Sequence, residues 1–377
     1  MKMKYSGNFA FGKNWQGFLK KHFSEQRLND ARKQLVELLG LPDLKGLVFL
    51  DIGCGSGIHS LAAWQAGAAL VFSFDYDRQS VAAAQALRAK AGAPANWRVC
   101  QGSVLDKEFM QTLPRADVVY SWGVLHHTGA VWQALENALI PLTGHGLLAI
   151  ALYSETRYRQ GVLAGHPSPE EWLAIKKSYN KSAWLGKRVM EARHLYRSYW
   201  APFMPDLWAG WRNLRRKRAL YEQNQRGMEF WTDMRDWLGG YPMEFVADRD
   251  CYVFMRNQGL EPLKAITGQG NTEYLFRPIK AHNSWDTRLA QRRMKELLPP
   301  FKPEKGFMYS CAAPLAGQLD FVWENDMPLG YANASLDAIE LLGVGRHLLG
   351  DNRLYFSTPD NSDPNTNNRA YRLSYYS

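Results

Sequence analysis

Residues 47–57 read Leu-Val-Phe-Leu-Asp-Ile-Gly-Cys-Gly-Ser-Gly, an apolar run that ends in three alternating glycines. The run predicts a buried strand, and the glycines predict a tight turn whose backbone adopts positive φ and approaches a ligand closely. A helix after such a turn offers free N–H groups to an anionic group. Because ligands of open α/β sheets bind outside the carboxyl ends of the strands, Gly53, Gly55 and Gly57 are predicted to hold one.

The spacing of these glycines indicates the kind of ligand. A dinucleotide-binding loop follows the pattern G-x-G-x-x-G, whereas here Gly57 is the third glycine and Ile58 follows it. Asp51 precedes the loop, where a carboxylate could pair with an ammonium group. Asp75 is the first acid after the next predicted strand, where a carboxylate accepts hydrogen bonds from ribose hydroxyls. The pattern favours a nucleoside that carries an amino-acid tail.

Around the loop, short apolar runs alternate with helical patterns, which is typical of a parallel sheet covered on both faces. Residues 260–267 and 272–276 predict an antiparallel pair that would close the sheet. The expected fold class is α/β, with a Rossmann-like seven-stranded, mostly parallel sheet and helices on both faces. The other strands are predicted at 47–51, 69–74, 97–101, 116–121 and 146–153, and helices at 58–66, 78–91, 128–142 and 248–257.

The flanking regions predict further parts of the molecule. Ser24 opens a helix that Gly40 ends. Pro299, Pro300 and Pro303 suggest a linker. The expected domains are an N-terminal arm and helix (1–45), a core (46–153 and 236–280), a helical insertion or lid (154–235) and a small β-rich C-terminal unit (281–377).

Four segments resemble a known family. LDIGCGSG, FDYD, QGSVLD and YSWGVLHHTG follow one another within residues 47–153, and they are similar to the successive motifs of class I S-adenosylmethionine-dependent methyltransferases. The resemblance implies S-adenosylmethionine as the cofactor and S-adenosylhomocysteine as the product. It implies that the three loop glycines surround the methionine part and that Asp75 lies at the ribose.

The same resemblance implies that Gly102, Ser103 and Val104 lie near adenine. Many members carry an acid where this chain has Ser103, so backbone contacts are expected to serve adenine here. Trp122 is expected to cover the adenine or the methyl group, or to belong to the core. With Asp51, these residues complete the predicted cofactor site.

The two histidines after the fourth predicted strand are candidate catalytic residues. Aligning the acceptor with the methyl group supplies much of the rate of methyl transfer, and a base is required only if the acceptor loses a proton. Histidine suits that role near neutral pH. We favour His127, with His126 second, although either could cap the next helix or pack in the core. Adjacent histidines lack the spacing of a chelating pair, so no metal is predicted.

Asp233, Asp236, Tyr241 and Glu244 form a predicted substrate-binding cluster. These side chains could hydrogen-bond sugar hydroxyls or cap helices. The segments FAFGKNW, RGMEFWTDMRDWLGGYPME and DNSDPNTN resemble a bacterial subgroup that is loosely associated with glycan and surface-polysaccharide biosynthesis. The motif Asn/Asp-Pro-Pro-aromatic, which base-amino methyltransferases carry, is absent at residues 121–124, which argues weakly against that activity.

The composition narrows the class of protein. The 377 residues carry a formal charge of +10, and residues 212–218 form a basic run that could be a solvated helix face or a docking patch for phosphate or acidic lipid. The four cysteines are far apart, and no apolar run approaches the ~20 residues of a membrane span. We expect a soluble cytoplasmic protein. Its oligomeric state is not determined by the sequence.

Three functions remain open at this point. The first is O-methylation of a sugar, a glycan or another small molecule, which the aromatic insertion and the polar cluster favour. The second is RNA modification, which the positive charge favours because phosphate neutralisation dominates nucleic-acid affinity. The third is a cofactor-binding scaffold without catalysis.

Overall fold

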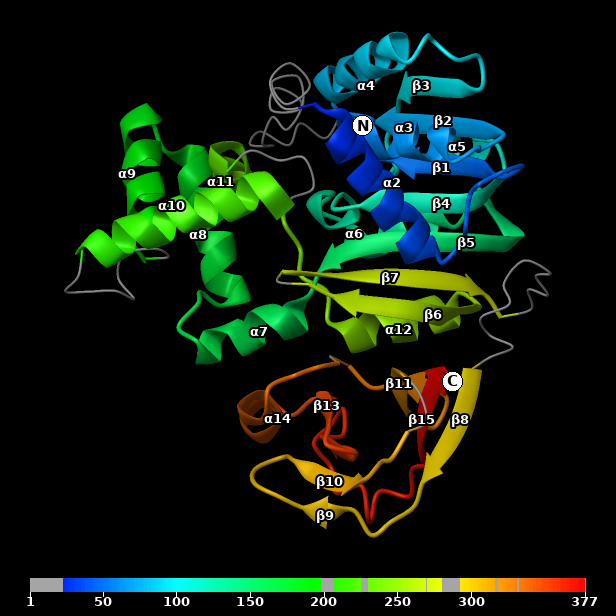
Figure 1. The fold of residues 1–377 in the computed structure, drawn as a ribbon. Coiled ribbons are helices and arrows are strands. Elements are labelled where there is room, and N and C mark those ends of the chain that lie inside the picture. Colours follow the sequence, from blue (N-terminus) through cyan, green and yellow to red (C-terminus); the bar gives the residue numbers. More distant parts are fainter. Residues whose placement is uncertain are drawn as a thin grey trace. The chain divides into compact units, whose positions relative to one another are not determined.

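The computed structural model describes residues 23–197, 207–224, 230–268, 270–279, 292–315, 318–330 and 332–376 (Figure 1). Its main feature is a seven-stranded sheet with the order β3-β2-β1-β4-β5-β7-β6. Neighbours among β1 to β4 run parallel, whereas β7 is antiparallel to both β5 and β6. The predicted Rossmann-like α/β class is confirmed, including the antiparallel pair.

Helix α2 (Glu25–Leu39) precedes the sheet and ends where the sequence predicts. The Ser24 Oγ accepts a hydrogen bond from the N–H of Arg27 at 3.3 Å, which satisfies one of the unpaired donors of the first turn. Gly40 closes the helix with a φ of +63°. Leu28 and Leu35 are buried on the face that packs toward α3.

The first part of the sheet comprises β1 (Val48–Ile52), β2 (Leu70–Asp75), β3 (Trp97–Gln101) and β4 (Ala116–Trp122). The helices between them are α3 (Ile58–Gln65), α4 (Arg78–Lys90) and α5 (Lys107–Thr112). Strand β1 pairs with β2 on one side and β4 on the other, and its last four residues are buried. Helix α5 was not predicted; it has only six residues, and the Asp106 side chain caps it by accepting from the N–H of Phe109.

The helix predicted at residues 128–142 is wrong in its bounds. A short 3-10 turn, η1 (Leu125–His127), is followed by α6 (Val131–Ala138), and β5 begins at Leu142. Gly129 has a φ of +77°, which separates η1 from α6. Pro141 has no N–H to donate and could not continue the helix. The helical apolar spacing therefore extends beyond the residues that form helical hydrogen bonds.

The remaining strands of the sheet are β5 (Leu142–Tyr153), β6 (Leu260–Thr267) and β7 (Asn271–Pro278), with α12 (Asp248–Asn257) before β6. Asp248 is buried beneath them, and its Oδ1 accepts hydrogen bonds from Ser154 Oγ at 3.0 Å, Thr272 Oγ1 at 3.1 Å and Tyr274 Oη at 2.5 Å. Three donors satisfy this buried acid, which therefore holds β5, β7 and α12 together.

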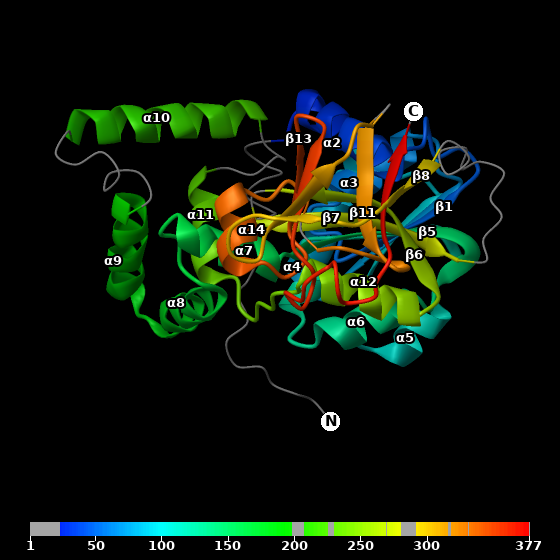
Figure 2. The ribbon, with the colours of Figure 1, turned by 90° about the horizontal axis from the view of Figure 1, so that it is seen from below.

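The region between β5 and α12 is helical, as predicted. It contains α7 (Glu155–Leu163), α8 (Pro169–Lys181), α9 (Trp184–Leu195), α10 (Leu207–Asn224) and α11 (Phe230–Gly239) (Figure 2). Tyr179 on α8 donates to Glu191 on α9 at 2.8 Å, and Arg235 on α11 lies 3.5 Å from the same carboxylate. A buried acid with partners on two other helices thus fixes which face of α9 points inward.

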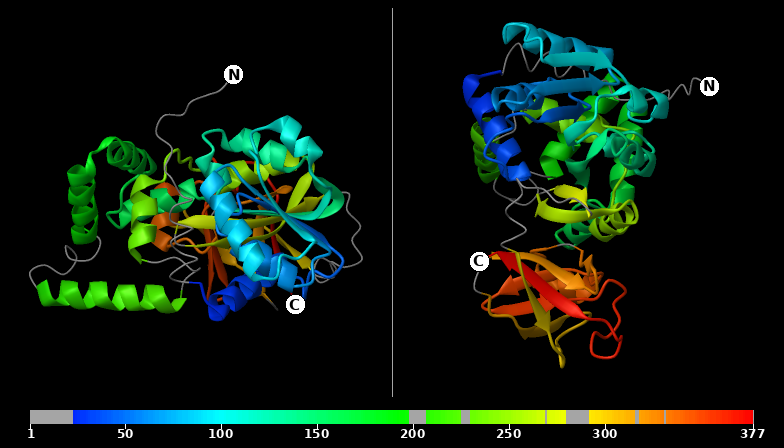
Figure 3. Two further views of the ribbon diagram at one scale, coloured as in Figure 1. Left: turned by 90° about the horizontal axis from the view of Figure 1, so that it is seen from above. Right: turned by 90° about the vertical axis from the view of Figure 1, so that its right-hand side faces the viewer.

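The C-terminal part is β-rich, as predicted, and forms two four-stranded antiparallel sheets, β13-β14-β10-β9 and β12-β11-β15-β8 (Figure 3). Its elements are β8 (Arg292–Leu297), β9 (Lys302–Pro303), β10 (Tyr309–Ala312), β11 (Gln318–Glu324), β12 (Met327–Pro328), α14 (Leu336–Leu342), β13 (His347–Gly350), β14 (Arg353–Phe356) and β15 (Tyr371–Tyr376). The linker suggested by Pro299, Pro300 and Pro303 is wrong. Phe301 is buried against Phe356 and Tyr371, so this stretch belongs to the core of the β-rich part.

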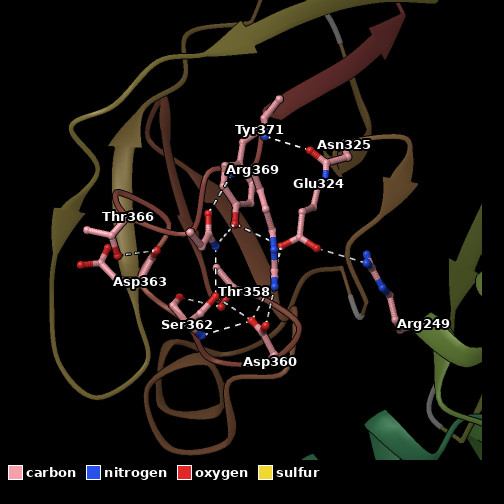
Figure 4. Close-up of polar contacts among 12 residues, drawn as sticks. Arg249, Glu324, Asn325, Thr358, Asp360, Ser362, Asp363, Thr366, Arg369 and Tyr371 are labelled. Atoms are coloured by element: carbon pink, nitrogen blue, oxygen red, sulfur yellow. Dashed lines mark hydrogen bonds and ion pairs between the residues drawn. The ribbon is translucent and has the colours of Figure 1, made fainter.

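A polar network joins the loops of this β-rich part (Figure 4). The buried carboxylate of Glu324 accepts hydrogen bonds from Arg249, Arg369 and Tyr371, each at 3.1 Å. Arg369 also binds both carboxylate oxygens of Asp360. The DNSDPNTN segment noted in the sequence is thereby held in place through its first residue. We interpret the network as structural, because its charges are paired among themselves.

By its internal contacts the chain divides into two compact units, Met1–Leu142 with Glu170–Glu244, and Thr143–Pro169 with Phe245–Ser377. This division does not follow the domain boundaries predicted from sequence, which remain a proposal. The candidate site residues all belong to the first unit. Among the described residues, no helix is both long and apolar enough to cross a membrane.

Candidate active site

The glycine loop lies between β1 and α3 and turns tightly at both ends. The N–H groups of Gly53 and Cys54 donate to the carbonyl of Phe74 on β2, at 2.8 and 3.0 Å. Gly53 has a φ of +74°, and a Cβ there would lie 2.4 Å from the Val124 side chain. Gly57 has a φ of +82° and begins α3. Only glycine meets both demands at Gly53, so the loop conformation follows from sequence.

Asp75 lies at the end of β2, beside the glycine loop. Its Oδ2 accepts a hydrogen bond from the N–H of Gly55 at 3.0 Å, and its Oδ1 accepts one from the N–H of Asp77 at 2.9 Å. Burial raises the pKa of Asp75 to about 6, although both N–H groups favour its ionised form. An ionised carboxylate has about four acceptor positions, so these N–H groups leave acceptor capacity for a ribose hydroxyl.

Asp51 is almost fully buried, as expected for the last residue of the predicted buried strand. It belongs to β1, pairs in register with Ser73 of β2, and accepts a hydrogen bond from Ser60 Oγ at 2.5 Å. Ser73 Oγ donates to Ser60 Oγ at 2.8 Å, and the indole N–H of Trp97 donates to Ser73 Oγ at 3.0 Å. The pKa of Asp51 is raised to about 7. Burial is the main cause, the hydrogen bond from Ser60 opposes the rise, and the nearby charge of Asp75 adds to it.

This hydrogen-bonded chain contains three residues that sequence reasoning missed: Ser60, Ser73 and Trp97. A signal existed, since Ser60 and Ser73 are polar residues inside otherwise apolar elements. This series of hydrogen bonds gives each buried hydroxyl a donor and an acceptor and ends at the Asp51 carboxylate. It holds the carboxylate in one orientation at the carboxyl end of β1.

The segment predicted to lie near adenine follows β3. The N–H of Gly102 donates to the carbonyl of Asp75 at 3.1 Å, and a Cβ at Gly102 would lie 2.2 Å from the ring of Phe109. Ser103 Oγ accepts from the N–H of Leu105 at 3.2 Å, which occupies it within its own turn. Val104 is buried, and its carbonyl accepts from Asn137 at 2.9 Å. The segment is thus brought directly beside Asp75.

Trp122 ends β4 and is partly exposed. Its ring centroid lies 6.5 Å from that of His59 on α3, and His59 lies 5.2 Å from Tyr120. These rings connect the end of β4 to α3, the helix that follows the glycine loop. Trp122 is therefore not fully buried, and its contact with the cofactor stays a prediction.

His127 has a defined protonation pattern. Its Nδ1 lies 2.7 Å from the carbonyl oxygen of Pro242, and because a carbonyl can only accept, Nδ1 carries the proton. The other nitrogen, Nε2, is then the basic one. The pKa of His127 is lowered to about 4. Burial is the main cause, the charge of Lys176 adds to it, and the hydrogen bond to the Pro242 carbonyl opposes it. His127 is thus a neutral imidazole at physiological pH.

Lys176 was not predicted as a site residue, and it is fully buried on α8. Its ammonium donates to the carbonyl of Trp237 and lies 5.5 Å from the centre of the Trp237 ring. Lysine is seldom buried unless its charge has partners. No spacing in the sequence links residue 176 to the histidines, so only the fold could identify it.

His126 and Glu244 have structural contacts. His126 is fully buried, and its carbonyl accepts from the N–H of Glu244 at 2.8 Å. The Glu244 Oε2 accepts from the N–H of Val131, the first residue of α6, at 3.0 Å. Burial raises the pKa of Glu244, and the N–H groups of Val131 and Gly129 oppose the rise. Of the two roles considered for Glu244, these bonds match helix capping.

The other predicted substrate residues are less closely described. Tyr241 is partly exposed and precedes Pro242, whose carbonyl holds His127. The ammonium of Lys177 lies 5.8 Å from the centre of the Tyr241 ring. Asp233 and Asp236 belong to α11, but their side chains lie outside the described part of the structure. The fold therefore brings Tyr241 and Glu244 to His126 and His127.

Comparisons with known proteins match this chain to methyltransferases and to a carboxymethyltransferase. A family model described as a methyltransferase domain matches residues 43–213. The chain is 26% identical over 148 residues to the ribosomal protein L11 methyltransferase of Tolumonas auensis, which covers 38% of this chain and 44% of that protein. It is 33% identical over 105 residues to the tRNA U34 carboxymethyltransferase of Klebsiella pneumoniae, which covers 27% of this chain and 30% of that protein.

Among solved structures, magnesium protoporphyrin IX methyltransferase from Synechocystis PCC 6803 with bound SAH aligns with a TM-score of 0.40 and 14% identity. The alignment covers 71% of this chain and 93% of that one. The chain spans less than half the length of the curated relatives named above.

Proposed function

We propose that this chain, whose residues 43–213 match a family model described as a methyltransferase domain, is a class I S-adenosylmethionine-dependent enzyme that transfers the methyl group of that cofactor to a hydroxyl of a sugar, a glycan or another small molecule. One observation carries the cofactor part of the proposal. Asp51 and Asp75 lie at the carboxyl ends of neighbouring strands, close enough for the charge of Asp75 to raise the pKa of Asp51, with the glycine loop hydrogen-bonded to Asp75.

The residues present fit this cofactor. Asp75 retains acceptor capacity for the ribose, and Asp51 offers a carboxylate for the ammonium of the amino-acid tail. Gly102 places its backbone beside Asp75, where adenine would follow the ribose, and Trp122 is the last residue of β4 in the same sheet. When bound, the cofactor supplies a methyl group already activated on a sulfonium. The protein then needs only to align the acceptor and remove its proton.

His127 supports an acceptor that loses a proton. The Pro242 carbonyl holds its proton on Nδ1, so Nε2 can accept one. The imidazole is neutral, and so able to accept a proton, at all pH values well above 4. Tyr241, beside Pro242, is the proposed contact for the acceptor, with Asp233, Asp236 and Glu244 as further predicted contacts.

A direct test uses purified protein, labelled S-adenosylmethionine and a bacterial extract separated into glycan, small-molecule, RNA and protein fractions. We expect label in the glycan or small-molecule fraction, and its loss with Asp75→Ala. Label confined to RNA or protein would contradict the acceptor class. Cofactor binding without label in any fraction would favour the scaffold alternative, and no binding of S-adenosylhomocysteine would contradict the cofactor assignment.

RNA methylation is a second candidate, which the exposed guanidinium groups of Arg215 and Arg216 favour. An RNA enzyme should bind polyanions with a steep salt dependence. The double change Arg215→Glu and Arg216→Glu should then abolish turnover, whereas a glycan enzyme should tolerate it.

We propose a cytoplasmic location, which Cys54, Cys100, Cys251 and Cys311 support because all four are free thiols.

A further inference from the structure

Helix α9 carries an exposed apolar stripe. Leu185, Val189, Ala192 and Tyr196 recur at intervals of four, three and four residues, which places them on one face of the helix. The exposed fractions are 67% for Leu185, 61% for Val189 and 48% for Tyr196. Trp184, at the start of the helix, is 71% exposed. An aliphatic stripe of this kind facing solvent indicates a surface that binds something.

The buried contacts of Glu191 fix the orientation of the stripe. Glu191 on the opposite face is buried and accepts hydrogen bonds from Tyr179 Oη at 2.8 Å and Arg188 at 2.7 Å. Arg235 lies 3.5 Å from the same carboxylate. Rotating α9 to bury Leu185 and Val189 would expose this cluster and break its bonds. The apolar stripe is therefore an outward face of the folded unit and not a misplaced core.

Helix α10 combines aromatic and basic residues on one exposed face. Trp208, Trp211, Arg212 and Arg215 follow the i, i+3, i+4, i+7 spacing of a single helix face. Trp208 is 75% exposed and Trp211 is 52% exposed. Leu214 faces the other way and is buried. Helix α10 thus presents amphipathic rings and guanidinium groups together.

The charge of both helices selects the partner. Residues 184–197 contain one acid, Glu191, which is buried and paired, and residues 208–216 contain none. The exposed basic residues include Arg193, Arg197 and Arg215. An anionic surface would be attracted by these charges. It must also accommodate aliphatic side chains, which nucleic-acid bases do not require, because bases stack on aromatic rings and guanidinium planes.

We propose that α9 and α10 dock onto the surface of a lipid bilayer that carries anionic headgroups. Leu185, Val189, Trp184 and Trp208 would enter the boundary between headgroups and acyl chains, where Trp and Tyr are enriched. The arginines would bind the lipid phosphates. This is attachment to one face of a membrane, not a span. The proposal does not depend on methyl transfer, because none of these side chains belongs to the candidate active site.

The test is co-sedimentation of the full chain with vesicles of phosphatidylcholine plus phosphatidylglycerol, and with phosphatidylcholine alone. We expect binding to the anionic vesicles only. The double change Leu185→Gln and Val189→Gln should weaken it at least about tenfold, because burying one aliphatic side chain is worth roughly that factor. Arg212→Glu with Arg215→Glu should abolish it.

Matched controls separate docking from general stickiness and from misfolding. Leu298→Gln changes a side chain that is 75% exposed in the β-rich part, and Arg98→Glu changes an exposed arginine on β3. Neither should alter vesicle binding, and all variants should bind S-adenosylhomocysteine as the unchanged protein does. If the double variant Leu185→Gln with Val189→Gln bound vesicles as well as the unchanged protein, the proposal would be overturned. The proposal would also be overturned if the protein bound RNA and not vesicles, and if the two arginine changes abolished that RNA binding.

Discussion

The N–H of Gly55 donates a hydrogen bond to Oδ2 of Asp75 across 3.0 Å, which ties the glycine loop after β1 to the end of β2. The two residues are 20 positions apart in the chain and come from different strand–helix connections. Their contact places the backbone that would surround a methionine tail next to the carboxylate that would bind a ribose. The following predictions test what this arrangement does.

Cofactor binding should weaken as pH falls below about 7. In the protein without ligand, burial raises the pKa of Asp51 to about 7, so Asp51 is largely protonated at lower pH. An ammonium group beside it favours the ionised form, so binding must release that proton. The affinity for S-adenosylhomocysteine should drop by up to about tenfold per pH unit in this range. Calorimetry in buffers of different ionisation enthalpy would measure the proton release.

The matched variant for this prediction is Asp51→Asn, which keeps the shape and a hydrogen-bond acceptor for Ser60. It should bind S-adenosylhomocysteine more weakly, and the proton release near pH 7 should disappear, so that only the release from Asp75 remains at lower pH. An unchanged protein whose affinity stays constant from about pH 5.5 to 8 would show that Asp51 does not pair with the ammonium.

Asp75→Ala should weaken S-adenosylhomocysteine binding by about 100-fold or more, since hydrogen bonds to a charged group contribute about 1.5–3 kcal/mol each. The neighbouring acid Asp77 is the control. Its side chain accepts from the N–H of Gln79 at 2.9 Å and caps α4, so Asp77→Ala should cost about 1 kcal/mol of stability and little affinity. Equal affinity losses for both variants would contradict the ribose assignment.

His127→Ala should lower kcat about 100-fold or more if His127 is the general base, with cofactor affinity unchanged. At saturating cofactor, kcat of the unchanged enzyme should be flat from about pH 6 to 9 and fall only as pH approaches 4, because protonation of Nε2 occurs near the lowered pKa. His145→Ala, at an exposed histidine, should leave turnover unchanged. Near-normal turnover of His127→Ala would remove the base assignment.

Lys176→Met should move the acid limb of that profile to higher pH. The charge of Lys176 is one cause of the lowered pKa of His127, so removing it allows the imidazole to take a proton more readily. Measuring kcat between about pH 4 and 8 tests this. Lys176→Arg retains the positive charge and should keep the original limb, so a limb that shifts equally in both variants would indicate disrupted packing and not a charge effect.

Glu244→Gln and Glu244→Ala separate capping from substrate binding. Loss of the bond to the N–H of Val131 should reduce the free energy of unfolding by about 1 kcal/mol in the Ala variant, as for other helix caps. If capping is its role, the KM for the acceptor should change little in Glu244→Gln. A KM that rises tenfold with stability intact would instead place Glu244 in the substrate site.

The glycine loop, Asp75 and the alternation of strands and helices could be predicted because each depends on local chemistry. Gly53 requires positive φ, Ser24 caps a helix, and apolar runs of strand length are buried wherever the fold places them. The bounds of α6 were missed because helical apolar spacing continues past Ala138, while Gly129 and Pro141 limit the hydrogen bonds.

The amino-acid sequence by itself determined the class of fold and the position of the cofactor loop, since spacing and turn chemistry act over a few residues. Only the tertiary structure decided the partners. It buried Asp51 against Ser60, brought Pro242 to the ring of His127 from 115 residues away, and placed a buried lysine where its charge acts on that ring. Such contacts depend on how distant elements pack, and burial then sets the protonation of each group because water no longer solvates its charge.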